Sequence, residues 1–200
     1  EAIPIFEEAI AIHRRWMGNS HPDLAEALEN LGGVYYRLGQ HERTLALLDE
    51  VIAMRREALG EDSAVVARSL VNMAAVLRQA GEKDRAEVIL RDAVVRMARA
   101  YGPEHPDVAS THRSLGWVLQ DLGRLGEAEV ELRTALAIAG RAFAAGSPAF
   151  AGYQQALGSL LVQRGVYTEA EPLLRAAYDA QLAANGADNW RATDGTVWRN

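Results

Sequence analysis

Few side chains in this 200-residue chain could support catalysis or hold a metal, and they are poorly grouped. Cysteine is absent, which excludes thiolate nucleophiles, disulfides and cysteine-ligated zinc. The five histidines include no pair with the H-E-x-x-H spacing that places two ligands on one helical face. No phosphate-binding glycine loop, G-x-S-x-G or S-x-x-K sequence is present. We therefore expect no catalytic residue, no metal and no cofactor, and keep an enzyme only as the last of three alternatives.

The densest carboxylate group is Glu127, Glu129 and Glu131, which resembles the paired acids of general acid–base catalysis. Glu127 and Glu131 are four residues apart and so share one face of a helix. A solvated helix face explains them better than catalysis does. His112 lies in an apolar register, and we expect a half-buried packing residue there rather than a metal ligand.

The charge of the chain limits its partners. Lys plus Arg is 21 and Asp plus Glu is 27, a net charge of −6, whereas a general nucleic-acid binder needs clustered positive charge. Lys83 is the single lysine, which removes a polybasic membrane tether. No apolar run reaches the length of about 18 residues that suggests a membrane span. We expect no nucleic acid, no membrane and a cytoplasmic location, with a removed signal peptide as the alternative.

A 42-residue internal repeat positions these side chains. Turn glycines recur at this step at Gly39, Gly81, Gly123 and Gly165. Leu31, Met73, Leu115 and Leu157 recur at the same step, each followed by glycine or alanine. Within the first period, steps of three and four predict one helical face from Leu24, Leu28, Leu31, Tyr35 and Leu38. A second apolar face follows the turn glycine, so each period predicts two helices.

Helix pairs that repeat in this way bury their apolar faces against their neighbours. The predicted fold is therefore all-α, a right-handed solenoid of stacked antiparallel hairpins. We expect one solenoid domain. It begins with the second helix of a preceding partial repeat at 1–18 and continues with four repeats at 21–62, 63–104, 105–146 and 147–188. It ends with the degenerate start of a fifth repeat, or a tail, at 189–200.

Both ends carry apolar residues that the repeat leaves without a partner. Residues 1–18 include Ile3, Phe6, Ile10 and Trp16, although a terminal repeat normally has a polar outer face. We expect an excised fragment or a self-association surface there, and similar behaviour at the other end, which carries Trp190 and Trp198.

The sequence Leu31-Gly32-Gly33-Val34-Tyr35, followed by Leu38-Gly39, resembles a tetratricopeptide repeat. The long period and the openings His21-Pro22-Asp23 and His105-Pro106-Asp107 are similar to the kinesin-light-chain type of that repeat. Versions rich in Asp and Arg are common in bacterial proteins. The resemblance implies protein–protein recognition through a concave surface, without catalysis. The alternative is a regulatory, sensor or scaffolding segment of a larger bacterial signalling or defence protein, acting through intramolecular contacts or self-association.

In such solenoids the first helix of each hairpin lines the concave side. The positions opposite its packing face, which we call the inner stripe, are the expected peptide-binding groove. They are Glu26, Glu29, Asn30, Tyr36, Arg37, Arg68, Val71, Asn72, Arg78, Gln79, Arg113, Trp117, Gln120, Asp121, Gln155 and Gln163.

The inner stripe predicts the chemistry of the partner. Four arginines against three carboxylates make it cationic on an acidic chain, and Trp117 adds an aromatic surface. We predict a protein or peptide with acidic residues and an apolar anchor. Trp117 fits packing between repeats equally well. Asn30 and Asn72 match backbone-binding asparagines of the family, but Ser114 and Ala156 interrupt that series.

Overall fold

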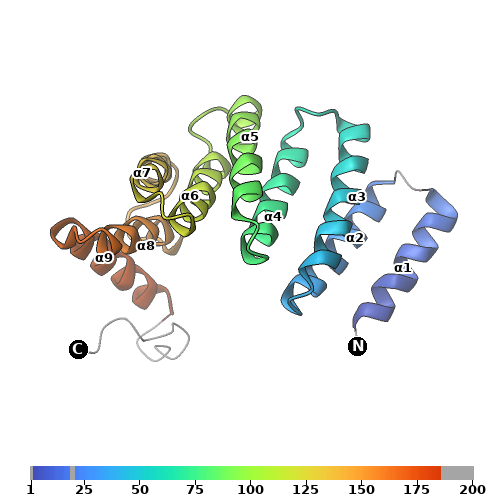
Figure 1. Cartoon of the computed structure of the whole chain (residues 1–200), viewed down its shortest axis with the longest axis horizontal. Coiled ribbons are helices and arrows are strands. Elements are labelled where there is room, and N and C mark those ends of the chain that lie inside the picture. The colour runs from blue at the N-terminus through green and yellow to red at the C-terminus, as the bar shows by residue number, and fades with distance from the viewer. Residues whose placement is uncertain (1, 19–20, 186–200) are drawn as a thin grey trace. The chain divides into compact units, whose positions relative to one another are not determined.

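The computed structural model describes residues 2–18 and 21–185, in which helices are the regular secondary structure and strands are absent (Figure 1). The helices are α1 (Ala2–Met17), α2 (Pro22–Arg37), α3 (His41–Leu59), α4 (Ala64–Gln79), α5 (Lys83–Tyr101), α6 (Pro106–Asp121), α7 (Leu125–Ala142), α8 (Pro148–Gln163) and α9 (Tyr167–Asn185). The predicted all-α class is confirmed. Trp190 and Trp198 lie outside the described residues.

The chain divides into two compact units, Glu1–Pro103 and Glu104–Asn200. In the first unit α2 pairs with α3 and α4 with α5, while α1 packs on α2 and α3 on α4. In the second unit α6 pairs with α7 and α8 with α9, while α7 packs on α8. Each unit is thus a stack of helix hairpins. The division coincides with the predicted boundary between the second and third repeats, and a single continuous solenoid domain stays a prediction.

The helix ends follow from local sequence. The His21 and His105 side chains cap α2 and α6, because their Nδ1 atoms accept from the backbone N–H groups of Asp23 and Asp107 at 3.2 and 3.1 Å. Between paired helices, Gly39 has a φ of +71°, a left-handed conformation that glycine adopts without strain. The turn glycines are therefore required by the backbone and explain part of the 42-residue pattern.

The predicted apolar faces form the interior of each unit. In the first unit Leu24, Leu28 and Leu31 are buried in a core that α1 joins through Ile10. Leu38 is the exception, since it follows the end of α2 and is 57% exposed. Its assignment to the packing face was wrong, because the chain has already left the helix at that position.

The glycine that follows the repeated leucine is packed differently in the two units. At Gly32 an added Cβ would lie 3.9 Å from Leu47 and Thr44, an ordinary contact distance. At Gly116, two periods later, an added Cβ would lie 2.6 Å from Leu132 Cγ. α6 and α7 therefore approach each other more closely at their glycine than α2 and α3 do.

This difference predicts opposite effects of one substitution. Gly32→Ala is expected to raise the free energy of unfolding by about 0.5–1 kcal/mol, because alanine is the better helix former and meets no clash. Gly116→Ala is expected to lower it by about 1–2 kcal/mol, since Leu132 must leave its position. Urea denaturation followed by circular dichroism measures both. Equal changes of the same sign would contradict the difference in helix spacing.

Candidate functional site

In the second unit, inner-stripe residues from α6 and α8 converge on one pocket. The pocket has a volume of about 250 Å³, and Trp117, Gln120, Gly152, Gln155, Ala156 and Ser159 line it. Beside it, Gln120 Nε2 donates a hydrogen bond to Gln163 Oε1 at 2.7 Å. Four residues that the sequence analysis placed on the inner stripe, in two different repeats, are therefore neighbours: Trp117, Gln120, Gln155 and Gln163.

Arg113 lies next to this pocket between two aromatic rings. Its guanidinium carbon is 5.0 Å from the Trp117 ring centroid and 4.4 Å from that of Tyr153. Gly152 makes room for it, because a Cβ at that position would lie 3.2 Å from Arg113 Nη1. Arg113 Nε is buried without a hydrogen-bond acceptor. The rings, rather than a carboxylate among the described residues, hold this cation in place.

Tyr153 is the rigid part of this arrangement. It is 5% exposed, and its ring stacks on Phe143 at a centroid distance of 6.0 Å. Burial raises the pKa of the Tyr153 hydroxyl, a shift that the Arg113 charge opposes and the Asp107 charge increases. The ring under Arg113 is therefore neutral and fixed.

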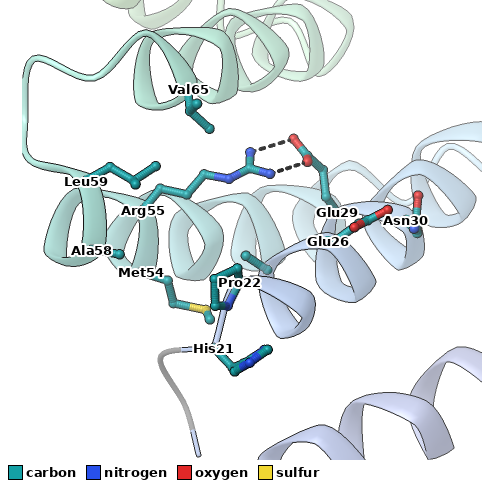
Figure 2. Close-up of a pocket in the computed structure, with 11 residues that line it drawn as sticks. His21, Pro22, Glu26, Glu29, Asn30, Met54, Arg55, Ala58, Leu59 and Val65 are labelled. Carbon is teal, nitrogen blue, oxygen red and sulfur yellow. Dashed lines mark hydrogen bonds and ion pairs between the residues drawn. The ribbon is translucent and has the colours of Figure 1, made fainter. Parts of the chain in front are cut away.

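In the first unit, a larger pocket of about 500 Å³ lies between α2, the end of α3 and the start of α4 (Figure 2). Arg55 reaches from α3 to Glu29 on α2, where Nη1 and Nη2 donate to the two carboxylate oxygens at 3.0 and 2.7 Å. Arg55 Nη1 also donates to the buried Ser69 hydroxyl at 2.6 Å, and Asn72 Nδ2 donates to Glu29 Oε1 at 3.3 Å. The Glu29 charge is thus compensated within the protein.

The remaining stripe residues do not gather at either pocket. Arg68 donates to the Tyr101 hydroxyl at 3.4 Å, and the Tyr36 ring meets the His41 ring edge-on at 6.2 Å. Val71 and Arg78 are half-buried, while Arg37, Gln79 and Asp121 are exposed. Arg68 and Arg78 belong to the first unit and Arg113 to the second. That these arginines form one cationic surface stays a prediction.

Three residues of these sites were missed by the sequence analysis: Arg55, Ser69 and Tyr153. Arg55 stands where the next repeats have Met97 and Ala139, so a charge at an apolar position could have identified it. Tyr153 likewise breaks a series of small residues. For both Arg55 and Tyr153, a residue type that departs from the repeat was the signal that could have identified the site residue.

The interpretation of the glutamates on α7 as a solvated face was wrong for two of them. Glu131 Oε2 lies 2.6 Å from His112 Nδ1, and both side chains are less than a fifth exposed, at 18% and 17%. Glu129 pairs with Arg133 at 2.8 Å and also with Arg164. Glu131 thus links α7 to α6, and Glu129 links α7 to the residue that follows α8. The half-buried position expected for His112 is confirmed.

Within the described ranges, no three or more His, Asp or Glu side chains form a group that could hold a metal ion. No helix in the same ranges is both long and apolar enough to cross a membrane.

The family model described as tetratricopeptide repeat matches residues 1–57, 24–94 and 86–141. No curated protein sequence matches the chain. Among solved structures, the kinesin light chain type TPR-like repeats of Podosopora anserina are 23% identical with a TM-score of 0.74, and the match covers 92% of this chain and 87% of that one.

Two further solved structures are similar. BtubC (BKLC) from P. vanneervenii is 24% identical with a TM-score of 0.78 over 92% of this chain and 74% of that one. MamA is 18% identical with a TM-score of 0.61 over 90% of this chain and 91% of that one. At these identities the likeness concerns the fold.

Proposed function

Because the chain belongs to the tetratricopeptide repeat family, we propose that it is a non-catalytic cytoplasmic module that binds a protein segment along its inner stripe. Repeats of this family are generally protein–protein interaction modules and are typically non-catalytic. The partner we propose is an extended or helical segment with an acidic residue and an apolar anchor.

The observation that carries this proposal is Arg113 held between Trp117 and Tyr153 at the edge of a pocket. Contact with aromatic rings does not use the hydrogen-bonding capacity of a guanidinium, and a carboxylate accepts two bonds from its N–H groups in parallel. The ring of Trp117 supplies apolar surface beside the charge. The glutamines around the pocket can donate to or accept from the backbone of a bound segment.

The test begins with a random peptide library displayed on phage and selected against the full chain. Selected peptides are expected to contain Asp or Glu near an apolar residue. Fluorescence anisotropy then measures the Kd of a selected peptide. Raising the salt concentration is expected to weaken binding, because the charges meet at a solvent-open surface.

Arg113→Met removes the charge and keeps an unbranched apolar side chain between the rings. It is expected to raise Kd about tenfold or more, as the loss of a charged hydrogen-bond partner does. Arg175→Met is the matched control in the same unit, because the Arg175 side chain is 72% exposed and its partner among the described residues is Glu171 on its own helix. Selected peptides without acidic residues, or equal binding to Arg113→Met, would refute the proposal.

A specific observation also favours the alternative of self-association. On α1, Ile5, Ile12 and Trp16 are 69%, 51% and 77% exposed. Their equivalents one repeat later on α3 include Leu47, which packs against the core, and Met54, which is buried. The apolar face that is covered on α3 is therefore exposed to solvent at the equivalent positions of α1.

If copies associate through this face, Ile12→Ser with Trp16→Ser is expected to reduce the average mass in sedimentation equilibrium toward that of one chain. Both side chains are exposed, so folding should be unaffected. A wild-type chain that sediments as a monomer at high concentration would exclude this alternative.

A further inference from the structure

The pocket of the first unit has an apolar wall and a negatively charged rim, whereas the pocket of the second unit lies beside the positive charge of Arg113. Pro22, Met54, Leu59 and Val65 contribute apolar surface to its lining. Leu59, in the last turn of α3, is 54% exposed although it is a large aliphatic side chain. This surface can cover the aliphatic part of a side chain that enters from solvent.

Arg55, the one arginine in this lining, already donates hydrogen bonds to other residues of the protein. Arg55 uses Nη1 and Nη2 on Glu29 and Ser69, and its side chain is only 17% exposed. An anion entering the pocket would have to displace Glu29 from a two-bond contact. The pocket is therefore poorly suited to the acidic residue proposed for the second unit.

Two acceptors on α2 remain available at the rim. Glu26 and Asn30 are one helical turn apart, both are exposed, and both line the pocket (Figure 2). Neither side chain forms a hydrogen bond or ion pair with another described residue. With Glu29 compensated by Arg55, the Glu26 carboxylate gives the rim a net negative charge.

We propose that this pocket binds an arginine side chain of a protein partner. The aliphatic stem packs on Pro22 and Met54, and the guanidinium donates to the Glu26 carboxylate and the Asn30 side-chain oxygen. Arginine fits because it combines an apolar stem with several donors in one plane. The inference rests on the proposed function only in that the arginine belongs to a protein segment, since the site lies in a different unit from Arg113.

The test uses the full chain with labelled methionine methyl groups and blocked tripeptides. Acetyl-Ala-Arg-Ala-amide is compared with its citrulline analogue, which has the same shape without the charge, and with the glutamate peptide. Met54 lines the pocket, whereas Met73 and Met97 are buried elsewhere in the same unit. We expect the arginine peptide to shift the Met54 methyl resonance and to leave those of Met73 and Met97 unchanged.

Variants separate charge recognition from shape. Glu26→Gln is expected to weaken the arginine peptide about two- to fivefold, the range for an exposed charge pair. Ala58→Trp places a large side chain on an exposed position of the lining and is expected to abolish the Met54 shift. Asp49→Asn is the control, because it removes an exposed carboxylate from the opposite face of α3.

Equal Met54 shifts with the citrulline or glutamate peptide would overturn the proposal, as would Glu26→Gln binding as tightly as the original chain. A lysine peptide that binds more tightly than the arginine peptide would contradict the choice of a planar guanidinium. Failure of the Arg113 experiment would leave these results unchanged, so the two proposals can fail separately.

Discussion

Leu115→Ala is expected to lower the free energy of unfolding by about 2–5 kcal/mol, the range for truncating a buried leucine. Leu115 is 2% exposed and lies beside Gly116, where α6 and α7 are in close contact. The tight spacing of these helices limits how far the surroundings can collapse into the cavity. Urea denaturation followed by circular dichroism measures the change.

Leu38→Ala is the matched control for this prediction. Leu38 belongs to the same leucine pattern but is 57% exposed, so its truncation should change stability by about 0.5 kcal/mol or less. Comparable losses for the two variants would mean that the packing face of the first helices has been assigned wrongly.

Arg55→Ala is expected to lower the free energy of unfolding by about 1–3 kcal/mol, less than for a fully buried pair because both side chains keep some exposure. The substitution leaves the Glu29 carboxylate, which is 28% exposed, without its two-bond partner. It also removes the donor that Arg55 provides to the Ser69 hydroxyl.

The double variant Arg55→Met with Glu29→Met tests this explanation. Removing both charges leaves no uncompensated carboxylate, so stability is expected to return to within about 1 kcal/mol of the original chain. Arg175→Ala, which breaks an exposed pair with Glu171, should change stability by less than about 0.5 kcal/mol. A double variant as unstable as Arg55→Ala would show that lost packing, rather than the unpaired charge, causes the effect.

The 42-residue period by itself determined the helix pairs and the glycine turns between them. These features depend on residues close in sequence: His21 caps its own helix, and Gly39 takes the positive φ of its own turn. Repetition strengthened the prediction, because each local pattern was available several times. The buried leucines followed for the same reason, since helical periodicity predicts which residues share a face.

The tertiary structure decided which residues meet across repeats. Arg113 and Tyr153 are 40 positions apart, and Arg55 and Glu29 are 26 apart, so no helical period relates them. Each contact also depends on a residue that departs from the repeat. The repeat pattern is defined by the residues that the repeats share and so does not use such departures. The contacts of a side chain depend instead on the helix that packs against it. The sequence therefore predicted the helical framework, and the packing of neighbouring hairpins determined which residues line the two pockets.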